Sequence, residues 1–513
     1  MAVSRRVLSA SALVAAGVAA AAFVGQLPAL GAPDRGFTVT PSSPGQSLVC
    51  PGPVVAVGAE GTAADEPTAT GRPSRTAGTA EGGKVDSTAL TRGGLGGGGT
   101  APRLLRAEPA RTAGQLAGAQ LEQVSGGDAA GLAASACTAP AADAWFAAGA
   151  TTTGRTTVLL LANPTSSPAR VDVRVWTEDG AIDPTGGGIA VRPRSRAAVP
   201  LAGLAPSAGG LALHVVSSGA RIGMAVEQRT VRGLESGGVD ITGTTAAPAL
   251  TQTIPGLRIS GGAAVAQTRT EDDYGDLQPV VRVLLPGARA ADVDIVLQPA
   301  AGGDPVRLGR RVAAGVVTDF PVPDLPDGTY TARLSSKQPF VAGARVSVVG
   351  DPAASATPDD GSAAAGGSGA PSDAAVGTDA GLVGGDGPVD TGSAAAPVTG
   401  SPTSTARGID LAWLAAAQPI GATAAVAVVD APSPVLTIAG DGTARTVRVS
   451  GAATGTVKVP AKGTAALPVA RGVVVLQGGA GTTAAVSYGG TAAVAGYPVE
   501  PADQEARPVR ITR

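Results

Sequence analysis

The pattern of apolar and polar positions predicts β-strands joined by tight turns. In residues 169–176 Val occupies three alternate positions, while Asp, Arg and Trp occupy the positions beside them. This period of two places successive side chains on opposite faces, as in a strand with one buried and one solvated face. Residues 156–162, 211–216 and 222–228 are also apolar-rich, and Asn-Pro and Ser-Ser-Gly turns separate such segments. We therefore expect β-sandwich hairpins within residues 155–231.

Similar sequence returns twice further along the chain. Residues 280–297 again hold two apolar segments separated by a Pro-Gly turn, and the Ser-Ser pair at Ser335 lies where the pair at Ser217 lay. Trp413-Leu-Ala-Ala echoes Trp145-Phe-Ala-Ala and marks a third copy. A period of roughly 120 residues is that of a domain, not of a solenoid repeat. Short strands about ten residues apart, separated by Gly, Pro and Asp, are typical of immunoglobulin-like sandwiches.

The predicted fold is therefore all-β: tandem immunoglobulin-like β-sandwich domains, disordered Gly/Ala/Ser/Pro linkers and an N-terminal signal or anchor helix. Residues 59–101 and 351–408 contain too few bulky apolar residues for burial to offset the entropy cost of ordering them. Residues 115–124 fit a strand or a short helix, and no amphipathic helix is expected after the first segment. The predicted organisation is a signal peptide or membrane anchor at 1–33, a small N-terminal β unit at 34–137 with a disordered insert at 59–101, sandwiches at 138–250 and 251–350, a disordered linker at 351–408, a third sandwich at 409–502 and a tail at 503–513.

Composition and charge exclude one class of partner. The 513 residues are 44% hydrophobic but only 2% aromatic, and the formal net charge is −2. A nucleic-acid-binding domain would show a basic stripe, so nucleic acid is not expected as a partner. Arg507, Arg510 and Arg513 form a short basic tail. We interpret it as a solvated end rather than a contact for anionic lipid or nucleic acid.

The first segment predicts export. Arg5 and Arg6 precede an uncharged run at residues 7–33, which is the pattern of an export signal. A run of this length could also span a bilayer if it is not removed. In that case the positive-inside rule leaves Arg5 and Arg6 in the cytoplasm and the remainder outside. The expected location is extracytoplasmic, secreted or anchored through this segment, and cleavage is left open.

The two cysteines fit an exported protein. An even number of cysteines outside the cytoplasm favours a disulfide, here between Cys50 and Cys137. The chain holds one histidine, His214, which leaves too few ligands for a zinc site and no candidate for most triads. We interpret His214 as a structural residue on a strand face, and we expect no cofactor.

Other candidates for chemistry are few. Residues 271–276, Glu-Asp-Asp-Tyr-Gly-Asp, form the one concentrated acidic cluster, which fits a solvated loop or a calcium-binding loop. A carboxylate enzyme centred on this cluster would require these acids to face a pocket. Trp145 and Trp176 are candidate ligand contacts, because exposed aromatic rings stack on sugars. Sandwich packing is the alternative interpretation of both tryptophans.

The order of several short motifs resembles an uncharacterised family of actinobacterial exported proteins that share a domain of unknown function. The resemblance covers about residues 50–350. It implies an N-terminal signal or anchor and an extracytoplasmic β-rich region associated with the envelope, with no established activity. The motifs that carry it are Cys-Pro-Gly-Pro at 50–53, residues 156–164 and 170–176, Leu-Ala-Pro at 204–206 and Gly-Gly-Val-Asp at 237–240.

Together these features predict a non-enzymatic structural or interaction protein of the cell envelope, whose strand edges and loops contact an envelope protein or a cell-wall polymer. A carbohydrate- or cell-wall-binding module is the alternative. It predicts an exposed aromatic ring in a groove near Trp145 or Trp176.

Overall fold

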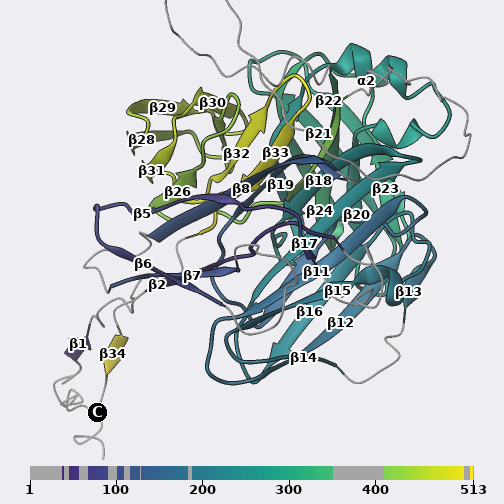
Figure 1. The fold of residues 1–513 in the computed structure, drawn as a ribbon. Coiled ribbons are helices and arrows are strands. Elements are labelled where there is room, and N and C mark those ends of the chain that lie inside the picture. Colours follow the sequence, from purple (N-terminus) through teal and green to yellow (C-terminus); the bar gives the residue numbers. More distant parts are fainter. Residues whose placement is uncertain are drawn as a thin grey trace, which may run out of the picture.

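The computed structural model describes residues 37–39, 46–56, 68–90, 101–108, 116–126, 129–182, 188–350, 408–501 and 509–511. Within these ranges the regular secondary structure is almost entirely β-strand, which confirms the predicted all-β class (Figure 1). One α-helix, α2 (Gly262–Thr268), lies in this part, together with the short 3-10 turns η2 (Leu201–Gly203) and η3 (Gly275–Leu277). The helix was not expected, because its seven residues lack a full amphipathic repeat.

The first repeated unit is a pair of antiparallel sheets around one core. Its sheets have the strand orders β10-β16-β12-β13, with β14 also on β12, and β15-β11-β17-β18. Val171 and Val215 from one sheet pack with Leu159 and Val226 from the other. The strands are β10 (Asp143–Phe146), β11 (Arg155–Asn163), β12 (Ala169–Thr177), β13 (Gly180–Ile182), β14 (Ile189–Val191), β15 (Ser195–Pro200), β16 (Ala212–Ser218), β17 (Gly223–Arg232) and β18 (Glu235–Thr242). β12 alternates buried and more exposed residues as its sequence predicts.

The second unit repeats this strand order. β19, the first half of β24, β21 and β22 form one sheet, and β25, the second half of β24, β20 and β23 form the other. A single 23-residue strand thus takes part in both sheets. The strands are β19 (Ala249–Ile259), β20 (Val280–Leu284), β21 (Ala291–Pro299), β22 (Val306–Val312), β23 (Val317–Pro321), β24 (Gly328–Gly350) and β25 (Gly408–Ala415).

The third unit has the same arrangement, with sheets ordered β26-β31-β28-β29 and β30-β27-β32-β33. The inferred internal repeat is therefore confirmed at the level of topology. Ser217 lies opposite Val171 and Ser336 lies opposite Val293, so the two Ser-Ser pairs correspond with an offset of one residue. The strands are β26 (Thr423–Val428), β27 (Val435–Ala439), β28 (Arg445–Gly451), β29 (Gly455–Val459), β30 (Thr464–Pro468), β31 (Gly472–Gln477), β32 (Thr483–Gly489) and β33 (Val494–Pro498).

The predicted start of the third unit at residue 409 is wrong. β25 pairs with β24 over eight residues, from Gly343 with Ala415 to Gly350 with Gly408, and so completes the second unit. Trp413 belongs to the last strand of the second unit, whereas Trp145 belongs to the first strand of the first. The shared Trp-x-Ala-Ala sequence suggests that the two tryptophans begin equivalent units. They do not, because they lie in two different strands that are both at unit boundaries.

The N-terminal unit also consists of β-strands. The prediction that residues 59–101 are a disordered insert is therefore wrong for part of this range. Residues 74–79 and 85–89 are strands that pair with β8 and β7. The sheets are β2-β7-β6 and β5-β8-β9, with β3 on β4. Its strands are β2 (Gln46–Cys50), β3 (Val55–Ala56), β4 (Thr68–Ala69), β5 (Ser74–Thr79), β6 (Val85–Ala89), β7 (Arg103–Ala107), β8 (Leu116–Gly126) and β9 (Ala129–Ala136).

The units pack on one another rather than lying apart. Ala119 and Leu132 of the N-terminal unit lie in the same apolar cluster as Leu436 and Val486 of the third unit. At the chain ends, β1 (Phe37–Val39) pairs with β34 (Val509–Ile511) (Figure 1). No helix in the described ranges is long and apolar enough to cross a membrane. The predicted segment at 1–33 and nearly all of the predicted linker at 351–408 lie outside those ranges.

Candidate functional site

A cleft of about 680 Å³ opens where the N-terminal unit meets the first and third units. This volume is in the range of roughly 300–1,000 Å³ that is usual for ligand-binding pockets. Residues of β2 and the start of β8 form one side, β10 and the turns around Pro164, Arg194 and Arg221 form another, and β26 with the end of β33 forms a third. Three units are therefore needed to build this cleft.

Besides Tyr497, the aromatic residue that lines the cleft is Trp145. β10 places it directly opposite His214 of β16, and the two rings stack with centroids 4.1 Å apart. Trp176 of β12 also stacks on Trp145, with centroids 5.6 Å apart. Both tryptophans pack against Leu284 and Val341 of the second unit. The structure thus brings the two predicted contact residues together, but only Trp145 lines the cleft.

The single histidine is a strand-face residue, as its sequence context predicts. His214 Nε2 lies 2.7 Å from a carboxylate oxygen of Asp143, and the His214 side chain is 17% exposed. Asp143 lines the cleft. Its position beside the imidazole means that one of the acidic groups of the cleft is already paired.

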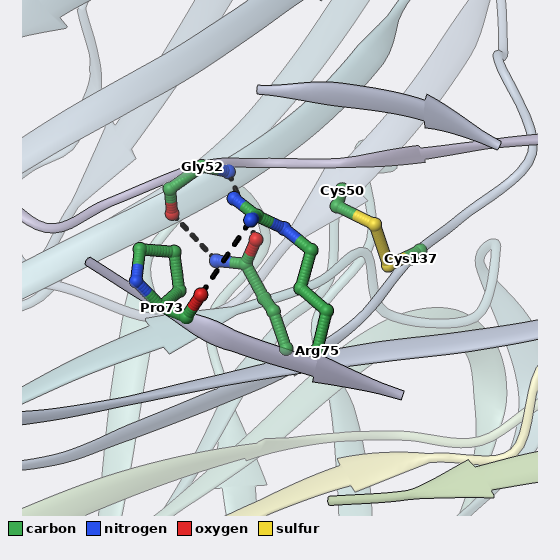
Figure 2. Close-up of a disulfide and its surroundings, with 6 residues drawn as sticks. Cys50, Gly52, Pro73, Arg75 and Cys137 are labelled. Carbon is green, nitrogen blue, oxygen red and sulfur yellow. Dashed lines mark hydrogen bonds between the residues drawn. A yellow bond between two sulfur atoms is a disulfide. The ribbon is translucent and has the colours of Figure 1, made fainter. Parts of the chain in front are cut away.

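The predicted Cys50–Cys137 disulfide is present (Figure 2), and Cys137 lines the cleft. Gly52 exchanges two hydrogen bonds with the Gln120 side chain, at 3.0 and 2.5 Å. Gly52 has φ +92°, and a Cβ there would approach Pro102, so this turn requires glycine. The Cys-Pro-Gly-Pro motif is therefore a fixed backbone support for the cleft.

Charged side chains around the cleft are mainly basic. Arg106, Arg194 and Arg221 line it, together with Asp143 and Glu500. None of the three arginines forms an ion pair within the ranges that the structure covers. Arg221 donates Nε–H to the Pro140 carbonyl (3.0 Å), which leaves its terminal nitrogens for another acceptor. Such guanidinium groups bind carboxylates and phosphates well.

Buried charges hold residues 50–55 against the first unit. Glu227 of β17 accepts the Val55 N–H through both carboxylate oxygens, at 3.2 and 3.0 Å. Arg196 of β15 donates twice to the Pro53 carbonyl, at 3.1 Å each. Burial raises the pKa of Glu227 to about 8, although nearby Arg196 and the Val55 N–H lower it. Burial also lowers the pKa of Arg196 to about 10.

A second buried carboxyl group joins four strands. Asp410 of β25 accepts backbone N–H groups from Leu132 of β9, Val239 of β18, Val494 of β33 and Leu411 beside it. Burial raises the pKa of Asp410 to about 8, and the four donors act in the opposite direction. This residue connects the N-terminal unit with all three repeated units.

Trp413 lies in the same interface rather than in a ligand site. Its indole N–H donates to the Gln228 side chain and its backbone N–H to Asp240, both at 2.7 Å. The guanidinium of Arg282 lies 4.6 Å from the Trp413 ring centroid, and that of Arg345 lies 5.9 Å away. These cation–π contacts stabilise the second unit, to which all three residues belong, while the two hydrogen bonds join Trp413 to β17 and β18 of the first unit.

The acidic cluster does not face the cleft, so the prediction of an enzyme site there is not supported. Residues 271–273 are exposed, and Asp276 bridges Arg155 and Arg232 at 2.8 and 2.6 Å. Burial alone would raise the pKa of Asp276, but these arginines lower it below its usual value. No group of three or more His, Cys, Asp or Glu side chains arranged to hold a metal ion occurs in the described part.

Sequence reasoning did not find the cleft or the buried charges. The cleft depends on residues from many segments that are distant in the sequence, and no local pattern marks such a site. Two of the buried charges did leave a signal, because Arg282 and Asp410 each interrupt an otherwise apolar strand.

The fold and cleft define a multi-unit β protein with a cleft lined by arginines and aromatic rings. The chain belongs to a family of unknown function, DUF5719, whose model matches residues 96–476. This match covers the first two repeated units, the third unit as far as β31 and much of the cleft lining, but it leaves out cleft residues 46–48, 497–498 and 500–501. No curated protein matches the sequence.

Proposed function

We propose that the protein is a non-enzymatic interaction protein of the cell envelope that works outside the cytoplasm. The observation that carries the proposal is the cleft, in which three units place arginines, an aromatic ring and outer strands around one space. These groups suit binding, since they supply shape and hydrogen bonds for a partner. The disulfide supports an oxidising compartment, and the export pattern of residues 1–33 supports the same location.

The finer features of the fold belong to this proposal. The two-sheet cores and common strand order support immunoglobulin-like sandwiches for the three units. Residues 1–33 act as a signal or a membrane anchor, and 351–407 act as a linker. The resemblance to actinobacterial exported proteins supports association with the envelope. The partner is an envelope protein or a cell-wall polymer, and no cofactor is required.

A carbohydrate- or cell-wall-binding module is the second candidate. The observation in its favour is that the Trp145 ring lines the cleft. Aromatic rings stack on sugar faces, and the cleft arginines would meet anionic groups of a wall polymer.

The purified, oxidised full chain tests both candidates by sedimentation with cell-wall polymers and by capture from an envelope lysate. Trp145→Ala alters the cleft, whereas Trp176→Ala alters the neighbouring ring that does not line it, so the two form a matched pair. Sedimentation with a polymer that Trp145→Ala abolishes supports the carbohydrate module. Specific capture of an envelope protein supports the interaction protein. Failure of both contradicts the proposed function.

A further inference from the structure

We propose that the cleft binds an extended acidic peptide segment of a partner protein, which adds as a strand to the free edge of β26. This inference rests on the interaction function proposed above and specifies the chemistry of the partner. It depends on two independent observations: the direction of the backbone groups of β26 and the charge of the cleft wall.

Among the strands of the described ranges, β26 is outermost in its sheet and pairs with β31 alone. Residues 425–427 of β26 line the cleft. An outer strand presents N–H and C=O groups that have no partner in the sheet, and an extended peptide can pair with them. The cleft therefore contains a template for strand addition.

The hydrogen-bond phase of β26 shows which residues face the cleft. Gly478 donates its N–H to the carbonyl of Ala422, so Ala422 faces the β31 side. Because the direction alternates along an antiparallel strand, Ala425 and Ala427 face away from β31. The Tyr497 hydroxyl donates to the Ala427 carbonyl (2.8 Å) on that outer side, which agrees with this phase. Ala427 is buried and its outward carbonyl is already bonded, whereas Ala425 is only partly buried, so the part of this edge that a peptide can reach in the cleft is at Ala425.

The charge of the wall selects an acidic segment. Arg194 and Arg221 line the same cleft, and neither forms an ion pair in the described ranges. The carboxylate of Asp143 is hydrogen-bonded to His214, and with Arg106 the three arginines of the cleft outnumber its two acidic residues, Asp143 and Glu500. A peptide that carries Asp or Glu on one face of its strand would form charge-assisted hydrogen bonds with the two guanidinium groups.

The observations favour a peptide over an acidic polysaccharide. A free strand edge offers alternating donors and acceptors at the spacing of a polypeptide backbone, which a sugar chain does not reproduce. Trp145 stacks on two rings of its own chain, His214 and Trp176, so part of its surface is already covered. This reduces the area on which a sugar could stack.

The test uses an acetylated, amidated octapeptide of alternating Glu and Val, titrated calorimetrically into the oxidised full chain at low salt. The same peptide with Lys in place of Glu is the charge control, and an analogue N-methylated at alternate positions is the backbone control. We expect only the unmodified Glu peptide to bind. Arg194→Gln with Arg221→Gln should weaken its binding about tenfold or more, since two charge-assisted bonds are lost.

Ala425→Pro tests the edge directly. Proline removes the outward N–H of residue 425 but leaves the pairing with β31, and edge strands tolerate such a proline. We expect binding of the Glu peptide to weaken about tenfold while the thermal midpoint changes little. If this variant does not fold, the N-methylated peptide still decides the point.

Equal binding of the Glu and Lys peptides, or undiminished binding of the N-methylated peptide, would overturn the inference. So would preferential binding of polygalacturonate over the Glu peptide, which would point to a polysaccharide. Loss of peptide binding with continued capture of an envelope protein would overturn the inference and leave the proposed function standing. Failure of both assays would overturn the two together.

Discussion

The carboxylate of Asp410 accepts a hydrogen bond of 2.9 Å from the backbone N–H of Leu132, which lies 278 residues earlier in the chain. The same carboxylate serves three further N–H groups. One side chain thus satisfies buried donors on β9, β18, β25 and β33, which no other strand completes. The junction of the units is specific because these donors have few alternative acceptors.

Asp410→Ala should therefore destabilise the fold strongly. The substitution leaves up to four buried N–H groups without an acceptor, and we expect a loss of roughly 3–5 kcal/mol in the free energy of unfolding. Urea unfolding followed by circular dichroism measures it. Asp430→Ala, at an exposed carboxylate, is the control. A loss no greater than that of the control would contradict the role of Asp410.

Stability should fall as the pH rises from about 5 to 8. Burial raises the pKa of Glu227 from 4.5 to about 8, so the folded chain keeps a proton that the unfolded chain releases. Stability from this group is complete below about pH 4.5 and is lost as pH passes through about 8. Glu227→Gln should reduce the slope of the melting temperature against pH. Asp410 shifts in the same direction, so some slope should remain.

The control for this experiment is Glu235→Gln, since Glu235 lies at an exposed position. It should retain the full pH slope of the original chain. A Glu227→Gln variant with an unchanged slope would mean that Glu227 is ionised in the folded protein throughout this range.

Loss of the Cys50–Cys137 disulfide should weaken both stability and binding. The bond spans 87 residues, and in the chain-entropy model such a loop corresponds to about 4–5 kcal/mol. We expect the double Cys→Ala variant to unfold at lower urea and to bind the Glu-Val peptide less tightly, because Cys137 lines the cleft. Unchanged unfolding would show that packing alone orders the N-terminal unit.

Cleavage between β24 and β25 should leave the two pieces together. Eight residue pairs join β24 to β25, and Asp410 and Trp413 make further contacts with other strands. None of these interactions requires a covalent connection between β24 and β25. A site-specific protease sequence inserted near residue 380 allows one cut. We expect the pieces to co-elute in size-exclusion chromatography and to separate in urea. Trp413→Ala should weaken their association, and separation of the original pieces without denaturant would contradict the prediction.

Local patterns predicted the strands well and their assembly less well. The alternation in residues 169–176 correctly gave β12, since a strand with one buried face requires that period. Residues 74–79 and 85–89 were assigned to a disordered insert because Thr, Ser and Gly replace bulky apolar residues there. They become strands because β8 and β7 supply pairing partners, which a single segment cannot reveal.

The site was predicted only in part, for a related reason. The disulfide followed from residue type, whereas the stacking of Trp145 on Trp176 was not predicted, because it depends on how the strands assemble. The position of β25 did not, because an intervening segment of more than fifty residues separates it from the strand that it completes. The cleft arginines could not be singled out either, since surface arginines at turns are common and only the assembled units bring Arg194 and Arg221 to one space.

The pairing of β1 with β34 places Val39 opposite Val509, so that the two ends of the described chain leave the body side by side. In topological terms the polypeptide is close to a ring with a single gap. A short loop could join β1 to β34, and new chain ends could be made in another loop, which is the condition for circular permutation. A chain reordered in this way would keep every strand neighbour, and the order of the units along the gene would then be a matter of history rather than of architecture.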